Sequence, residues 1–249
     1  MSLPIALQLY TIRDAMKADF EGALKQVADM GYQYVELAGL AGRTPEQAKA
    51  VLDELGLKAI ASHEGIDRLK DDLDGAIKQA TTFGYDLLVC PYIGEEYRTA
   101  EGYTRAANIL ADAAAKAKPA GMTVCYHNHA FEFEPIDGGN GMTILAEQAK
   151  GVQFELDLFW VVRGGEDPFA WMRKLAGRLP VLHVKDMSDG EKPDFAEVGT
   201  GVLALEAMVA EGPTHGVRYL VVEQDGNWID GDPLASARIG YENLSAWVG

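Results

Sequence analysis

Short apolar runs alternate with amphipathic segments along the whole chain. Each run is rich in β-branched and aromatic residues and is too short for a core helix, so each run predicts a buried strand. The eight runs lie at residues 5–11, 34–38, 58–63, 86–93, 122–128, 152–158, 180–186 and 218–224.

The segments between the runs have helical spacing and recognisable helix ends. Residues 44–56 begin with Thr44 as the N-cap, Pro45 at the first helical position and Gln47 in the capping-box position, and they end at Gly56. We predict further helices at residues 20–30, 71–84, 100–121, 141–150, 167–178, 203–211 and 233–247.

Eight strand–helix repeats predict an α/β fold with a parallel sheet, and 249 residues suit a closed (β/α)8 TIM barrel. The repeats use the whole chain, so we expect one domain over residues 1–249. A doubly wound open sheet is the alternative, but it usually has a glycine-rich phosphate turn after its first strand. This chain has Tyr10-Thr11-Ile12-Arg13 at that place.

Polar residues recur near the carboxyl end of one predicted strand after another. A strand that is covered on both faces should be nearly all apolar, so these residues are costly unless they meet in a shared site. Active sites of TIM barrels lie at this end of the strands. The residues are Gln8, Glu36, His63, His127, Asp157, His183, Lys185 and Glu223.

Four of these residues form a candidate metal site. His127, Asp157, His183 and Glu223 come from four consecutive strands. Imidazole and carboxylate ligands together suit one divalent ion such as Mn²⁺, Co²⁺, Zn²⁺ or Fe²⁺ and leave room for substrate oxygens. Mg²⁺ is also compatible with this set of ligands. The alternative interpretation is a rim of polar residues that hydrogen-bond to one another without a metal.

Charge and composition exclude several classes of function. The 22 basic and 38 acidic residues give a net charge of −16, which argues against binding to nucleic acid or to an anionic membrane surface. No apolar run approaches the roughly 18 residues of a membrane helix, and the N-terminus lacks a basic signal-like region. Cys90 and Cys125 are too few for a disulfide framework. We therefore expect a cytoplasmic protein with two buried thiols.

The chain resembles the xylose-isomerase-like TIM barrels, a group of sugar phosphate isomerases and epimerases. The resemblance covers essentially the whole chain. It rests on LQLYTIR, YHNHAFEFE, FELDLFWVVRGGEDP, VLHVKD, FAEVGTGVL, and VVEQD followed by DPLASARIGYENL. It implies one metal ion at the barrel mouth, held by Glu, Asp, His and Glu from the ends of strands five to eight. Relatives often form dimers or tetramers, so a homo-oligomer is open.

Asp157, His183 and Glu223 match the last three ligand positions, but the first position departs from the pattern. Where many relatives have Glu-Asn-His, this chain has His127-Asn128-His129. Three explanations stay open: His127 replaces the glutamate, Glu132 reaches in from the loop, or the chemistry differs.

The resemblance implies proton abstraction next to the carbonyl of a small carbohydrate, through a metal-stabilised enediolate. Glu223 is the candidate base, and His127 or His129 is the candidate second acid/base. The preferred interpretation is a sugar isomerase or epimerase. The runner-up is a lyase that eliminates a leaving group from a 3-keto-glycoside. A DNA-repair endonuclease conflicts with the acidic charge and the five histidines, and a non-catalytic sugar-binding barrel stays open.

The remaining candidates each have a structural alternative. Lys185 follows His183 with strand spacing and can stabilise an oxyanion or pair with Glu155. Gln8 and Tyr10 cannot both face inward, so at most one contributes directly. The candidates for contact with substrate are Glu36, His63, His129, Trp160 and Arg163, of which Trp160 can stack on a sugar and Arg163 can meet an anion or lie in solvent.

Overall fold

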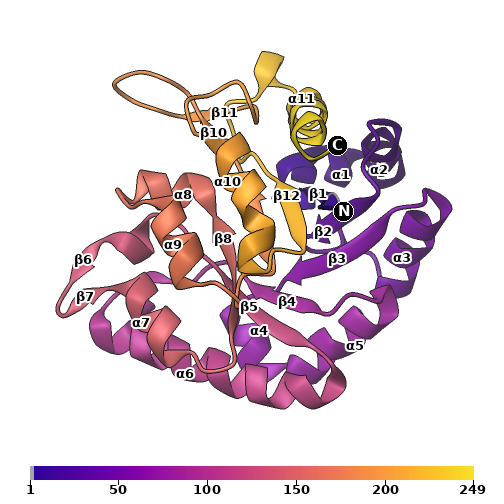
Figure 1. The fold of residues 1–249 in the computed structure, drawn as a ribbon. Helices are drawn as coiled ribbons and strands as arrows, with labels where there is room; N and C mark the ends of the chain where they lie inside the picture. Colours follow the sequence, from indigo (N-terminus) through magenta and orange to yellow (C-terminus); the bar gives the residue numbers. More distant parts are fainter. Residues whose placement is uncertain (1–2) are drawn as a thin grey trace.

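Eight parallel strands close into a barrel, which confirms the predicted (β/α)8 fold (Figure 1). The computed structural model describes residues 3–249. The order around the barrel is β1-β12-β9-β8-β5-β4-β3-β2, and every neighbouring pair is parallel. The strands are β1 (Ile5–Gln8), β2 (Tyr34–Leu37), β3 (Lys58–His63), β4 (Leu87–Cys90), β5 (Thr123–His127), β8 (Gln153–Asp157), β9 (Val181–Val184) and β12 (Tyr219–Val222).

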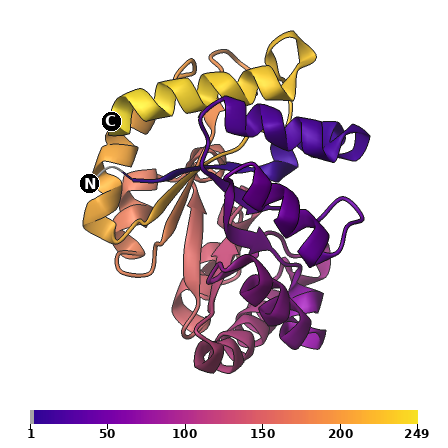
Figure 2. The ribbon, with the colours of Figure 1, turned by 90° about the vertical axis from the view of Figure 1, so that its right-hand side faces the viewer.

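Helices surround the barrel on the outside (Figures 1 and 2). The predicted capping box of α3 is present, because Thr44 Oγ1 accepts a hydrogen bond from the Gln47 amide and Gln47 Oε1 accepts one from the Thr44 amide. Within residues 3–249 no helix is both long and apolar enough to cross a membrane. The helices are α1 (Arg13–Ala18), α2 (Phe20–Asp29), α3 (Pro45–Glu54), α4 (Ile66–Asp71), α5 (Leu73–Phe83), α6 (Ala100–Ala117), α7 (Gly141–Gln148), α8 (Leu158–Arg163), α9 (Pro168–Lys174), α10 (Leu205–Glu211) and α11 (Pro233–Val248).

Helix α8 (Leu158–Arg163) is not among the helices that the sequence predicts, since the predicted strand ends at residue 158 and the next predicted helix begins at residue 167. The side chain of Asp157 accepts a hydrogen bond of 2.9 Å from the Trp160 amide and so caps this helix directly after β8. An apolar run alone does not distinguish a strand from a buried helical turn. The Asp157 cap that favours the helical turn depends on how the chain bends after β8. Two short hairpins, β6 (Pro135–Ile136) with β7 (Gly139–Asn140) and β10 (Asp186–Met187) with β11 (Phe195–Ala196), were also not predicted.

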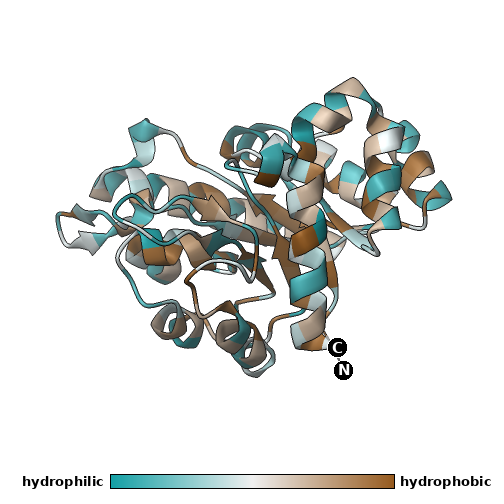
Figure 3. Ribbon diagram, turned by 90° about the horizontal axis from the view of Figure 1, so that it is seen from above, coloured by the Kyte–Doolittle hydropathy of each residue, from teal (hydrophilic) through white to brown (hydrophobic). Residues whose placement is uncertain are grey.

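The strands separate two apolar regions. A large core lies between the barrel and the helices, whose outer faces are hydrophilic (Figure 3). A small cluster fills the inside of the barrel with Ala6, Ile60, Ala61, Leu87, Val89, Cys125, Val181 and Val221. Above this cluster the inward positions become polar. The strand register places His127 beside Glu155 and Asp157 beside His183, so the polar ends meet at one level.

The buried carboxylate of Asp186 fixes the loop that follows β9. Its Oδ1 atom accepts hydrogen bonds from the backbone amides of Met187 and Leu203, at 2.8 and 3.2 Å. Its Oδ2 atom accepts two more from Gly199 and Gly201, at 2.9 and 3.0 Å. A charged acceptor that satisfies four backbone donors stabilises the loop strongly.

We predict that Asp186→Asn lowers the free energy of unfolding by about 2–3 kcal/mol, because an amide offers one acceptor oxygen and leaves two backbone donors facing its NH₂ group. Urea unfolding followed by circular dichroism measures the change. Asp189→Asn is the matched control, since Asp189 is exposed and accepts only from Gly190. Equal stabilities of the two variants would contradict this role of Asp186.

Candidate functional site

A cavity of about 460 Å³ opens at the carboxyl ends of the strands. Five predicted site residues line it, namely His63, His127, His129, Lys185 and Glu223. The other lining residues are Tyr10, Ala38, Pro91, Tyr92 and Asp225. Tyr10 therefore reaches the cavity, and Gln8 lies beneath it, fully buried.

The structure brings the four candidate metal ligands together. One donor atom each from His127, Asp157, His183 and Glu223 lies within 4.8 Å of the others, and all four residues are buried. His127 Nε2 lies 3.8 Å from Asp157 Oδ2, and His183 Nδ1 lies 2.9 Å from Glu223 Oε2. Two imidazoles and two carboxylates thus converge, with His127 and Glu223 on the cavity wall and Asp157 and His183 fully buried next to them.

Glu155 lies beneath this group and holds three histidines at once. Its Oε1 atom is 3.1 Å from His63 Nε2, 3.0 Å from His127 Nδ1 and 2.9 Å from His183 Nε2. A carboxylate on the second nitrogen of a ligating imidazole fixes the orientation and the tautomer of the ring. The sequence interpretation missed this role, although Glu155 shares the inward direction of Asp157 two residues later.

Glu36 supports the same layer from β2. It is fully buried, its Oε2 atom accepts a hydrogen bond of 2.8 Å from Gln8 Nε2, and it lies 2.7 Å from His183 Nε2. Burial first, and the nearby Glu155 charge second, raise the pKa of Glu36 to about 7. Glu36 was predicted to contact substrate, but the structure places it behind His183 rather than on the cavity wall.

Lys185 pairs with three carboxylates and not with Glu155. Its Nζ atom is 3.1 Å from Asp157 Oδ2, 2.7 Å from Glu223 Oε2 and 2.9 Å from Asp225 Oδ2. Burial alone would lower the pKa of Lys185, but the three carboxylates raise it well above its ordinary value. Asp225 was not singled out from the sequence, although its position two residues after Glu223 could have indicated it.

The histidines differ in protonation. Burial lowers the pKa of His127 to about 3, so its ring is neutral. Its Nδ1–H donates to Glu155, and its Nε2 lone pair faces Asp157. Burial would also lower the pKa of His183, but Glu155 and Glu36 raise it well above its ordinary value. A metal ion that binds His183 Nδ1 therefore has to release a proton.

The residues fit a divalent ion. Asp157 Oδ2 is buried and accepts no hydrogen bond, although it faces the Lys185 ammonium at 3.1 Å. Lys185 can keep its contact with Asp225 when Asp157 and Glu223 turn toward a cation. Mixed imidazole and carboxylate ligands suit first-row transition metals. The His/Asp/Glu cluster can therefore hold a metal ion.

A second set of donor atoms, from His63, His127, Glu155 and His183, also lies within 4.8 Å. It uses the opposite nitrogens of the two shared histidines, namely His127 Nδ1 and His183 Nε2. Those nitrogens already contact Glu155. This set therefore orients the rings, and the set that contains Asp157 and Glu223 can hold an ion without displacing Glu155.

Glu132 belongs to neither group of converging donor atoms. Its Oε1 atom accepts a hydrogen bond of 2.6 Å from the Tyr126 hydroxyl, and its Oε2 atom accepts one of 2.8 Å from the His129 amide. Tyr126 points away from the barrel interior, because its neighbours Cys125 and His127 point inward. Among the three explanations for the altered motif, the geometry therefore favours His127 in place of the usual glutamate.

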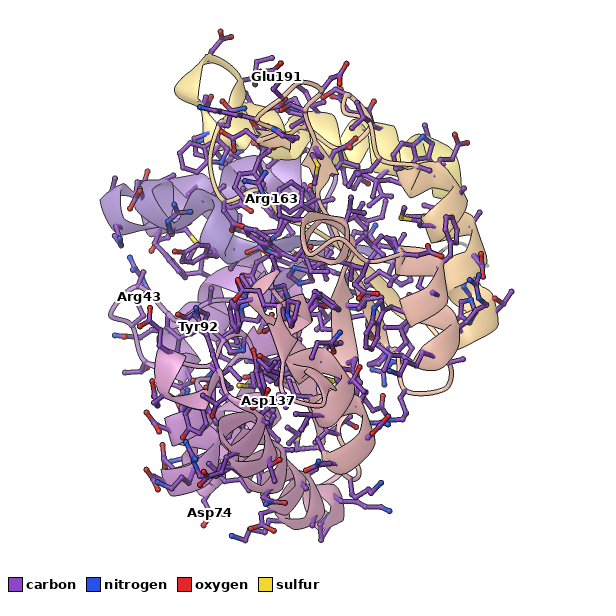
Figure 4. All side chains as sticks on the ribbon, turned by 90° about the vertical axis from the view of Figure 1, so that its left-hand side faces the viewer. Arg43, Asp74, Tyr92, Asp137, Arg163 and Glu191 are labelled. Carbon is purple, nitrogen blue, oxygen red and sulfur yellow. The ribbon has the colours of Figure 1, made fainter. Side chains whose placement is uncertain are left out.

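Trp160 and Arg163 lie off the cavity wall. The Trp160 ring centroid is 5.4 Å from that of His129, and Lys185 Nζ lies 5.7 Å from the Trp160 ring, so Trp160 packs beside the site. The Arg163 guanidinium donates to the Pro193 carbonyl. In the view of Figure 4 Arg163 lies between Glu191 and Tyr92, and it lines a different hollow together with Glu191, Lys192 and Pro193. The structure therefore does not bring Arg163 to the cavity.

Glu132 should make stability depend on pH. Burial raises its pKa to about 7 from an ordinary 4.5, so the folded state binds the proton more tightly and stability falls as pH rises between these values. We predict that the free energy of unfolding falls by about 3 kcal/mol less in Glu132→Gln than in the wild type between pH 4.5 and 7.5. Urea unfolding at pH 4.5 and 7.5 measures it, with the exposed Glu134→Gln as control. Equal pH slopes in wild type and Glu132→Gln would contradict the assignment.

Comparisons with known proteins agree with the barrel. A family model described as xylose isomerase-like TIM barrel matches residues 24–225. No curated protein matches the chain. A sugar phosphate isomerase/epimerase from Parabacteroides distasonis superposes with a TM-score of 0.86 at 22% identity, over 99% of this chain and 100% of that chain.

Two further solved structures share the fold at lower identity. A xylose isomerase-like TIM barrel protein from Mycobacterium smegmatis in complex with magnesium has a TM-score of 0.76 at 15% identity, over 99% and 96% of the two chains. A probable 3-DHS dehydratase from Bacillus anthracis has a TM-score of 0.72 at 12% identity, over 97% and 99%. The chain belongs to the xylose isomerase-like TIM barrel family.

Proposed function

We propose that this protein is a divalent-metal-dependent isomerase or epimerase of a sugar or sugar derivative. The observation that carries the proposal is the convergence of His127, Asp157, His183 and Glu223 next to a cavity large enough for a carbohydrate, which His127 and Glu223 line. The family membership supports it, and so does the name of the Parabacteroides neighbour. The expected partner is a small carbohydrate, and neither nucleic acid nor membrane is expected.

The four converging residues would hold one ion, either Mn²⁺, Co²⁺, Zn²⁺, Fe²⁺ or Mg²⁺. When bound, the ion supplies positive charge to a carbonyl oxygen and its neighbouring hydroxyl. Glu155 holds the far nitrogens of His127 and His183 and so keeps the near nitrogens directed to the ion.

Glu223 is the proposed base. It would take the proton from the carbon next to the carbonyl, and the electron pair of the broken C–H bond would move to the carbonyl oxygen. Burial alone would raise the pKa of Glu223, but Lys185 and His183 hold it well below its ordinary value, so the group is a carboxylate. Lys185, which also lines the cavity, is placed to donate a hydrogen bond to the oxyanion.

The place and the face at which a proton is returned to the substrate decide between isomerisation and epimerisation. Glu223 alone can return the proton to the neighbouring carbon on the same face, which is an isomerisation. Epimerisation needs a proton donor on the opposite face, and we assign that place to His129, which lines the cavity three strands away around the barrel. His127 is not available, because its Nδ1–H faces Glu155 and its Nε2 would bind the ion. His129 lines the cavity, so its ring can contact a bound substrate. His63 also lines the cavity and adds a further polar group that a substrate can contact.

A lyase is the second candidate. The observation that favours it is the imidazole of His127 where a second catalytic glutamate would otherwise stand. Elimination needs one base to take the proton and one group to protonate the leaving group, so it does not require two carboxylates. The same ion and the same Glu223 would serve both reactions.

The test measures bound metal and the exchange of solvent deuterium into the C–H next to the carbonyl, across a panel of ketoses. We expect metal-loaded wild type to exchange one ketose class and Glu223→Gln to be slower by about 10²–10⁴-fold. The exposed Glu134→Gln is the control and should exchange at the wild-type rate.

Stoichiometric metal without exchange on any ketose would contradict the isomerase proposal. Release of an aglycone from a 3-keto-glycoside without formation of an epimer would favour the lyase instead.

A further inference from the structure

Asp225 takes no part in the proposed proton transfer, although it lines the cavity. It lies in the loop after β12, two residues beyond Glu223, and it belongs to neither group of converging donor atoms. Its side chain is 24% exposed, whereas the side chains of Glu223 and Asp157 are 4% and 0% exposed. Asp225 is therefore the most accessible of the three carboxylates that surround Lys185.

The Lys185 ammonium contacts both carboxylates of the candidate ligand set. Its Nζ atom is 3.1 Å from Asp157 Oδ2 and 2.7 Å from Glu223 Oε2. A divalent ion held by the four converging residues would use the same two carboxylates, so two positive charges would share them. Like charges this close in a buried site repel each other strongly, because little water screens them. Lys185 therefore opposes metal binding unless another anion balances its charge.

Asp225 is an anion that can balance this charge. Its Oδ2 atom is 2.9 Å from Lys185 Nζ, and the ion would leave it free because Asp225 lies outside the ligand set. The Lys185 side chain is only 2% exposed, so the ammonium has little water around it. A buried ammonium without a paired anion is costly. Asp225 thus decides how much free energy is lost when Asp157 and Glu223 turn from Lys185 to the ion.

The backbone of Asp225 is held in place by the segment that follows β1. Arg13, the first residue of α1, donates a hydrogen bond of 3.2 Å from Nη2 to the Asp225 carbonyl. The amide of the preceding residue, Gln224, donates one of 3.2 Å to Thr11 Oγ1. Arg13 thus binds the main chain of Asp225, and the carboxylate is left to Lys185.

We propose that Asp225 is a positioning residue for Lys185 and that it thereby sets the affinity of the site for a divalent ion. With Asp225 as its partner, Lys185 leaves the two ligand carboxylates to the ion and stays on the cavity wall, where it can donate to a substrate oxygen. The proposal rests on the proposed function only in the binding of a divalent ion. It does not depend on which carbohydrate reacts, or on whether the reaction is an isomerisation or an elimination.

Isothermal titration calorimetry with Mn²⁺, on protein first stripped of metal with a chelator, tests the proposal through metal affinity alone. We expect Asp225→Asn to bind Mn²⁺ about tenfold more weakly than wild type, since members of one salt-bridge network couple by energies of this order. Asp225→Glu keeps the negative charge and should stay within about threefold of wild type. The control Asp189→Asn removes one charge from the exposed loop after β9, where Asp189 accepts from Gly190, and should bind Mn²⁺ like wild type.

Lys185→Met separates the proposed role of Asp225 from direct attraction between its carboxylate and the ion. Without the ammonium the site should bind Mn²⁺ more tightly than wild type. Asp225→Asn added to Lys185→Met should then change the affinity by less than about threefold. If circular dichroism shows that Lys185→Met does not fold, the comparison of Asp225→Asn with Asp225→Glu and Asp189→Asn decides.

Three results would overturn the proposal: an unchanged Mn²⁺ affinity in Asp225→Asn, an equal loss in Asp189→Asn, or an equal loss from Asp225→Asn with and without Lys185. Wild-type protein that binds no Mn²⁺ would overturn it as well. A failure of the proposed function looks different, because it appears as Mn²⁺-loaded protein that exchanges no deuterium into any ketose.

Discussion

The carboxylate of Glu155 meets the nitrogens of two buried histidines and one half-buried histidine at the centre of the barrel, and the whole candidate site depends on that contact. An imidazole can present either nitrogen to the cavity, and its ring can rotate. With Glu155 on the far nitrogens of His127 and His183, the near nitrogens face Asp157 and Glu223. A buried charge is costly unless it is paired, so three partners also explain how this carboxylate persists within the barrel.

The arrangement of Asp157, Lys185 and Glu223 depends on the layer of Glu155 and the histidines beneath them. Asp157 uses one oxygen to begin α8, and its other oxygen faces His127 and Lys185, so the backbone fold and the geometry of the cluster depend on the same side chain. Lys185 balances the charge of Asp157 and Glu223, and Asp225 offers it an alternative partner. The Lys185 ammonium thus supplies positive charge to the carboxylates of the site, and a bound metal ion would partly replace it.

The sequence predicted the barrel and the polar strand ends, because both follow from local patterns. Alternation of apolar runs and capped helices is a property of each segment alone, and parallel strands bring their carboxyl ends together. It did not predict the role of Glu155, because that depends on the register of three strands. It could not place Tyr92 at the cavity or Arg163 away from it, because both positions depend on how the chain turns after a strand.

A crystal structure of the protein soaked with Mn²⁺, with the ion located by anomalous scattering, tests the central claim most directly. We expect one ion in contact with His127 Nε2, Asp157, His183 Nδ1 and Glu223, with Glu155 still on the far nitrogens of both rings. An ion bound instead to His127 Nδ1, His183 Nε2 and Glu155 would contradict that assignment. So would coordination by Glu132 in place of His127.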